Sequence, residues 1–188
     1  MPPPMNVGYV AMDPSRKGGV DVQGQAGGGS WVPGPAGGGG AAMHVEPFVA
    51  KRVSLPIGVG AGGSGFGGHI PLRVGVRHRA TKVFAWGAGI GPSVIVDRNF
   101  GSVSGIADLE VVLGVQKPII GFSLGIRPAL SFTERDLTVY VLGDPTLAIV
   151  LVGTTSLTLA IPFGGWVDTA TADGSGFMAG AIGVHRRF

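Results

Sequence analysis

The 188-residue sequence contains no cysteine, which excludes disulfide bonds, thiolate nucleophiles and cysteine-ligated metals. Charged residues make up 13% of the chain, about half the share typical of soluble domains. The glycines follow no collagen-like period of three, and no repeat of fixed length is present. A well-hydrated surface is hard to build from so few charges. The composition therefore disfavours an ordinary soluble globular protein.

Glycine and apolar residues are abundant instead. The chain holds 36 glycines, and 45% of its residues are hydrophobic, so too much of it requires burial for a disordered protein. The length suits one domain. We expect a Pro-rich and then charged leader or short strand over residues 1–17 and a single domain over 18–188, with a long Gly-rich loop at 27–40. Residues 1–6 lack the features of a secretory signal, and we expect the sequence to be that of a processed mature form.

From residue 18 onwards, apolar residues alternate with small, polar or charged ones at a period of two, which is typical of β-strands. Ten strands are predicted, each of 12 to 16 residues: 18–31, 40–51, 54–66, 69–81, 83–97, 102–115, 119–132, 137–152, 156–167 and 175–188. Strands of soluble proteins hold about 5–6 residues, whereas a tilted strand needs about 9–11 to cross a bilayer. The fold class predicted is all-β, an antiparallel up-and-down transmembrane β-barrel of about ten strands, with eight or twelve also possible.

Nine charged residues fall inside the predicted strands, all on the small-and-polar face. They are Asp21, Glu46, Arg73, Arg77, Asp108, Glu110, Arg127, Asp144 and Arg187. A charge facing lipid at mid-membrane costs about 2–4 kcal/mol, and five acidic residues nearly balance four basic ones. We therefore expect these nine residues to form an ionic network inside a narrow lumen, with the apolar rows facing lipid. The glycines on the same inner face have no side chains and would leave room for this network.

Two features oppose this interpretation. The 22 residues from Thr146 to Val167 carry no charge, as a transmembrane helix would, although Gly153 to Ser156 and Pro162 favour a hairpin. Prolines also fall inside seven predicted strands, where they cannot donate to a ladder. They are Pro47, Pro56, Pro71, Pro92, Pro128, Pro145 and Pro162. The strand prolines leave open a soluble β-sandwich or barrel that binds an apolar ligand or assembles into a shell or fibre.

The last strand alternates through Ile182 and Val184 and ends in Phe188, with Arg186 departing from the apolar row. At this point the chain resembles bacterial outer-membrane β-barrel proteins as a class, and no particular family within it. The resemblance implies location in the bacterial outer membrane, contact with the lipid bilayer and lipopolysaccharide, and recognition of Ile182, Val184 and Phe188 by the barrel-assembly machinery.

The sequence shows no constellation of catalytic residues, so we expect no enzyme, no metal and no cofactor. A lipid hydrolase or acyltransferase would need His78 or His185 beside a serine. The net charge of +3 is scattered, and no nucleic-acid partner is expected. The function predicted is that of a small outer-membrane barrel with a side-chain-filled polar lumen and a structural, surface-display or narrow-pore role.

Overall fold

The computed structural model describes residues 19–32, 37–64, 67–97, 103–132 and 137–188. The predicted leader at 1–17 and the centre of the predicted Gly-rich loop at 33–36 lie outside the described residues. Within them the chain is all-β, without helices. Twelve strands are present in this part of the chain: β1 (Val20–Val32), β2 (Gly37–Ala50), β3 (Val53–Ser54), β4 (Ile57–Ser64), β5 (Gly67–Arg79), β6 (Phe84–Asp97), β7 (Val103–Gln116), β8 (Ile120–Phe132), β9 (Leu137–Val152), β10 (Thr155–Ala160), β11 (Phe163–Asp168) and β12 (Gly174–Arg187).

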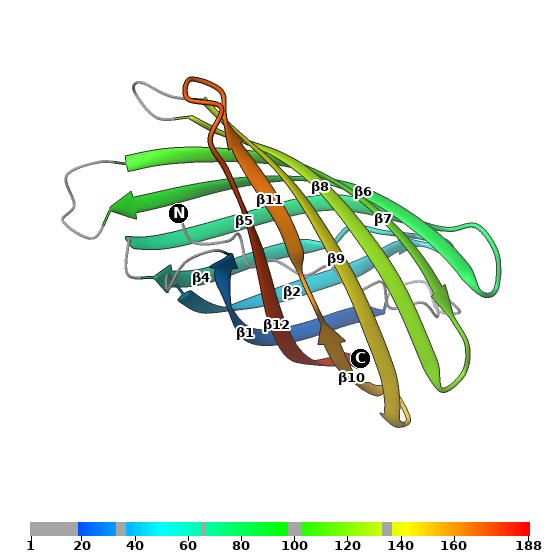
Figure 1. Cartoon of the computed structure of the whole chain (residues 1–188). Helices are drawn as coiled ribbons and strands as arrows, with labels where there is room; N and C mark the ends of the chain where they lie inside the picture. Colours follow the sequence, from blue (N-terminus) through cyan, green and yellow to red (C-terminus); the bar gives the residue numbers. More distant parts are fainter. Residues whose placement is uncertain (1–18, 33–36, 65–66, 98–102, 133–136) are drawn as a thin grey trace.

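The strands form one closed antiparallel barrel, and β12 lies between β1 and the pair β10 and β11 (Figure 1). Closure is complete because β1 also pairs with β2, which leaves no sheet edge unpaired. The pieces β3 and β4 flank Pro56 and together fill one position between β2 and β5. The pieces β10 and β11 flank Pro162 and fill one position between β9 and β12. The described residues thus form a barrel of ten strands, which confirms the predicted number.

The strand prolines lie where a ladder is interrupted. Pairing of β5 with β6 stops at Pro71–Ser93 and resumes at Val74–Ile90, which leaves a gap opposite Pro92. Pairing of β7 with β8 skips the position opposite Pro128 in the same way. Because proline has no N–H to donate, each of these two gaps coincides with a missing donor. The prolines are therefore compatible with a closed barrel.

The prediction of a long Gly-rich loop over 27–40 is wrong for most of that segment. Strand β1 continues to Val32, and β2 begins at Gly37. Glycines 27–29 pair with glycines 38–40 in regular register. The glycines form a smooth part of the barrel wall, and partners on both sides impose the extended conformation that the local sequence does not favour.

The predicted hairpin in the uncharged segment 146–167 is confirmed. Strand β9 ends at Val152, a two-residue turn follows, and β10 pairs back onto β9. The turn contains Gly153 at a φ of 56°, a left-handed conformation that glycine adopts without strain. No helix in the described residues is long and apolar enough to cross a membrane.

The apolar rows face outward and the charged residues face inward. On β7, for example, Leu109 is 59% exposed and Val111 is 53% exposed, whereas Asp108 and Glu110 are 5% exposed. Large apolar residues are exposed in the same way on every strand from β2 to β12 apart from the short β3. Water-soluble barrels and sandwiches have the opposite arrangement, so the soluble alternative is wrong. The molecule is a membrane β-barrel, since only hydrocarbon can cover such an exterior.

A charge placed at the middle of the outer face tests this orientation. Replacing Leu109 with Arg is expected to lower the free energy of unfolding in phospholipid vesicles by about 2–4 kcal/mol. Val83, which is exposed at the turn between β5 and β6, provides the matched position, and Val83→Arg is expected to cost about 0–1 kcal/mol. Denaturant titration of both variants measures the difference, and equal losses would contradict a lipid-facing Leu109.

Candidate functional site in the lumen

All nine charged residues predicted for the lumen lie on the inner face of the barrel. Eight of them are at most 7% exposed, and the Arg187 side chain is 20% exposed. Arg127 and Asp144 have no exposed surface. The structure thus places these residues together in two groups, one at mid-height and one at the end where β1 begins and β12 finishes.

The central ionic cluster consists of Arg73, Asp108, Glu110, Arg127 and Asp144. The guanidinium of Arg73 bridges two carboxylates, with Nη2 at 3.0 and 3.1 Å from the Asp108 oxygens and Nη1 at 2.6 Å from Glu110 Oε1. Nη2 of Arg127 lies 2.5 Å from Asp144 Oδ2. Buried ions are tolerated only when they are paired, and the guanidinium groups meet that requirement for three carboxylates.

Inward-facing glycines make room for these long side chains. Gly91 lies on β6 beside Asp108, and a β-carbon there would stand 2.5 Å from Asp108 Oδ1. Gly125 lies beside Asp144 on the next strand, with Glu110 Oε1 3.6 Å from its ideal β-carbon position. At these positions the lumen is occupied by side chains that reach across from neighbouring strands. This explains why glycines and charged residues occupy adjacent positions on the inner face.

The turn-end ionic cluster consists of Asp21, Glu46, Arg77, His185 and Arg187. Arg187 donates to both oxygens of Asp21 at 2.8 and 2.9 Å, and His185 Nε2 lies 3.2 Å from Asp21 Oδ2. Arg77 donates to Glu46 at 2.6 Å. Side chains of this cluster, with Gln23 and His44, line a cavity of about 10 Å³. Such a cavity has room for about one water molecule.

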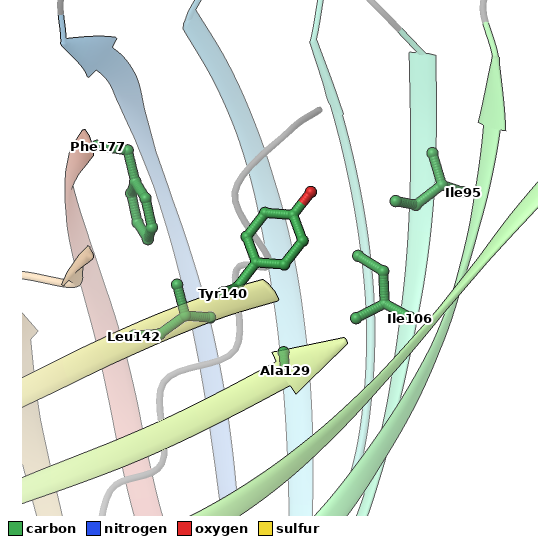
Figure 2. Packing of buried hydrophobic residues seen from close by; sticks show 6 residues of the cluster. All are labelled: Ile95, Ile106, Ala129, Tyr140, Leu142 and Phe177. Carbon is green, nitrogen blue, oxygen red and sulfur yellow. The ribbon is translucent and has the colours of Figure 1, made fainter. Parts of the chain in front are cut away.

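An apolar cluster lies in the opposite half of the lumen. It consists of Ile95, Ile106, Ala129, Tyr140, Leu142 and Phe177, and their side chains point into the space that the strands enclose (Figure 2). The half-buried Trp166 packs against it. The Tyr140 hydroxyl hydrogen-bonds to Ser131. The cluster lies near the strand ends that lead to residues 98–102 and 133–136. The lumen is therefore filled from both sides of the central ionic cluster.

The sequence did not single out several residues that complete these clusters. Ser54 donates to Glu46 at 2.5 Å, and the Arg187 guanidinium lies 5.5 Å from the centroid of the Phe48 ring. His185 shares the inward parity of Arg187, which was a usable signal for its place beside Asp21. Ser54 belongs to a two-residue strand, and Phe48 faces inward from a predominantly apolar strand end. Neither position carries a pattern that predicts its contact.

One serine lies beside a histidine that the hydrolase alternative requires. Ser156 on β10 is the cross-strand partner of His185, which in turn contacts Asp21. Both residues are at most 5% exposed, and His185 also lines the small cavity of the turn-end ionic cluster. Among the described residues, no group of three or more His, Asp and Glu side chains is arranged to hold a metal ion.

The residues predicted as an assembly signal lie on the outer face. Ile182, Val184 and Phe188 are more than half exposed, and Arg186 shares their face. The Arg186 guanidinium stands 5.1 Å from the centroid of the Phe188 ring. This cation–π contact gives the Arg186 charge a partner within an otherwise apolar row at the edge of the barrel.

Comparisons with known proteins give matches among solved structures only. No family model matches the chain, and no curated protein matches it. The translocator domain of autotransporter NalP from Neisseria meningitidis is 16% identical, with 91% of this chain and 88% of that chain covered and a TM-score of 0.48. The KdgM porin is 7% identical, with 90% and 99% covered and a TM-score of 0.47. A loop-deletion mutant of OmpT, an outer membrane protein of Vibrio cholerae, is 11% identical, with 91% and 100% covered and a TM-score of 0.40. At TM-scores below 0.5, the description of the fold rests on the strand pairing and exposure of this chain.

Removing one partner of the central pair is expected to destabilise the barrel. Arg127→Leu leaves the Asp144 carboxylate buried without its guanidinium, which is expected to cost about 3–5 kcal/mol of unfolding free energy. The double variant Arg127→Leu/Asp144→Leu removes both charges and is expected to recover a large part of this loss. Denaturant titration of Arg127→Leu, Asp144→Leu and the double variant in detergent measures the coupling. Additive losses would show that the two side chains do not interact.

The glycine beside Asp108 is expected to be intolerant of a methyl group. Gly91→Ala places a β-carbon against the carboxylate that Arg73 binds, and the displacement is expected to cost about 1–3 kcal/mol. The control is Gly105→Ala on β7, because a β-carbon at Gly105 has no atom within 4 Å. Thermal unfolding in detergent should rank the two variants in this order. A Gly91→Ala melting temperature at or above that of Gly105→Ala would contradict the tight fit.

Proposed function

We propose that the chain is a small bacterial outer-membrane β-barrel whose lumen is closed by its own side chains and which acts as a structural or surface-display element. The observation that carries the proposal is the fully buried pair of Arg127 and Asp144 at mid-height. A water-filled pore would leave solvent-exposed surface on lumen-facing charges at this level. The central ionic cluster instead occupies the space between the walls.

Three further features support a closed barrel. The apolar cluster adds a layer from which water is excluded, and hydrated ions would have to lose their water to cross it. The turn-end cavity has room for about one water molecule. A barrel of this strand number is also only slightly wider than one that side chains alone can fill. The proposal includes no catalytic activity and no cofactor.

The outer-membrane location is supported by the exterior and by the topology. Transmembrane β-barrels of bacterial outer membranes have an even number of antiparallel strands and an outward apolar band, and this barrel has ten strands with such a band. The turns at the end where β1 begins and β12 finishes hold two to four residues, as periplasmic turns do. We propose that the other end faces outward, with Ile182, Val184 and Phe188 recognised by the barrel-assembly machinery and lipopolysaccharide surrounding the outer rim.

Electrical recording tests the closed lumen against a narrow pore. The full chain, folded in detergent and inserted into planar bilayers, is expected to give no stepwise current above the bilayer background in about 1 M KCl. The variant Arg127→Ala/Asp144→Ala/Tyr140→Ala/Phe177→Ala removes filling from the ionic and apolar layers and is expected to conduct. Insertion of both proteins is checked by heat-modifiable migration on a gel. Stepwise currents from the unmodified chain would contradict the closed lumen. Recovery of the folded chain in the aqueous fraction without detergent would contradict its assignment as a membrane protein.

A further inference from the structure

Exposed charges at the turn end of the barrel have a single sign. The turns there are residues 51–52, 80–83, 117–119 and 153–154, beside the two strand termini. The exposed charged residues at this end are Lys51, Arg52, Lys82, Lys117 and Arg186, and together they are termed the basic ring. The acidic residues that the structure describes near this end, Asp21 and Glu46, are buried inside the lumen. Among the described residues, the exposed charged side chains at this end are therefore all basic.

The opposite end carries the opposite charge among the described residues. Asp97, at the end of β6, and Asp168 and Asp173, at the connection between β11 and β12, are the charged residues there that the structure describes. Among the described residues, the exposed charged side chains of the turn end and those of the β11–β12 connection thus differ in sign. A protein with basic residues spread evenly over its surface would not show this difference in charge between its two ends.

The basic ring stands on a rigid base. Backbone hydrogen bonds join successive turns around the barrel, for example from Arg79 N to Arg52 O at 2.9 Å and from Gln116 N to Val83 O at 2.8 Å. The circle continues through Val150 N to Ile119 O and Arg187 N to Thr154 O. The Arg79 guanidinium donates to the carbonyls of Thr81 and Lys82 and fixes the turn that presents Lys82. Positions of the basic residues are therefore set by the fold.

The basic ring borders the lipid-facing surface directly. Val83, Ile119 and Val152 are exposed apolar residues at the same turns, with Ile119 at 71% and Val152 at 79%. Lysine and arginine next to such a boundary extend their apolar stems along hydrocarbon and place their charged groups at the depth of the lipid phosphates. Among the described residues, Lys51, Arg52, Lys82 and Lys117 take part in no ion pair. Their charge is available to an anionic group outside the chain.

We propose that the basic ring binds the headgroups of anionic phospholipids in the leaflet that meets the turn end. This inference rests on the proposed membrane location, in which that leaflet is the periplasmic one. The phosphate of phosphatidylglycerol carries the negative charge, and lysine and arginine near a membrane surface attract such lipids within about a Debye length. The basic ring would bind the headgroup, and the adjacent exposed apolar residues would contact the acyl chains of the same lipid. A soluble anion has no acyl chains and would make only the first contact.

The test compares lipids at the barrel surface. The full chain is reconstituted in phosphatidylcholine nanodiscs with a trace of spin-labelled phosphatidylglycerol or spin-labelled phosphatidylcholine, and electron paramagnetic resonance measures the fraction of label immobilised by the protein. We expect phosphatidylglycerol to be enriched about threefold over phosphatidylcholine, and to lose this preference in about 1 M NaCl, where the Debye length falls to about 3 Å. Both leaflets have the same composition, so the result does not depend on the direction of insertion.

Two variants define the contribution of the ring. Lys51→Gln/Arg52→Gln/Lys82→Gln/Lys117→Gln is expected to reduce the preference to about one, while Lys51→Arg/Lys82→Arg/Lys117→Arg, which keeps the charge, is expected to retain it. Asp168→Asn/Asp173→Asn at the other end is the matched control and should leave the preference unchanged. Equal immobilisation of both lipids by the unmodified chain would overturn the inference, as would a preference that survives in the glutamine variant.

This experiment separates the inference from the proposed function. Correct insertion, seen as heat-modifiable migration, together with equal lipid immobilisation, would overturn lipid binding by the ring and leave the closed membrane barrel in place. Failure of the folded chain to insert into nanodiscs would overturn both. Currents through the barrel would contradict the closed lumen alone, because the basic ring lies outside the lumen.

Discussion

Hydrocarbon cannot hydrogen-bond, and this single property of the surroundings orders the whole molecule. Every backbone N–H and C=O within the membrane must find a partner in the chain, which the closed ring of strands supplies. Every ion must be held away from lipid, which leaves only the interior. The exposure of Leu109 beside the burial of Asp108 and Glu110 shows the result on one strand.

Placing ions in a narrow interior creates a second problem, because arginine and glutamate are long. Glycines on the neighbouring strands have no side chains and therefore leave room for these long side chains. Gly91 lets Arg73 reach from β5 across β6 to Asp108 on β7. The central ionic cluster thus links strands that are not neighbours in the sheet, and pairing satisfies charges that would be costly alone. Burial of the charges and their pairing are consequences of the same packing.

The two ends of the barrel differ in the side chains that they carry. Short turns, joined by backbone hydrogen bonds, hold the basic ring at one end. The apolar cluster lies near the other end, where the connections include the acidic residues Asp168 and Asp173. The interior is therefore polar at one end and apolar at the other.

The sequence alone indicates about ten strands, their approximate ends and the face on which each charged strand residue lies, because a period of two assigns alternate residues to opposite sides of a sheet. It also indicated which face meets lipid, since an apolar row without charges on every strand is a global pattern. Pairing partners were decided by tertiary structure, because the register between strands fixes which carboxylate Arg73, Arg77 or Arg127 meets. The strand conformation of glycines 27–29 and 38–40 was likewise decided by neighbours on both sides, since isolated glycines favour turns as readily as strands. The alternation of apolar and polar residues can be recognised within a single strand. Contacts between side chains depend instead on the register between strands that are distant in the sequence.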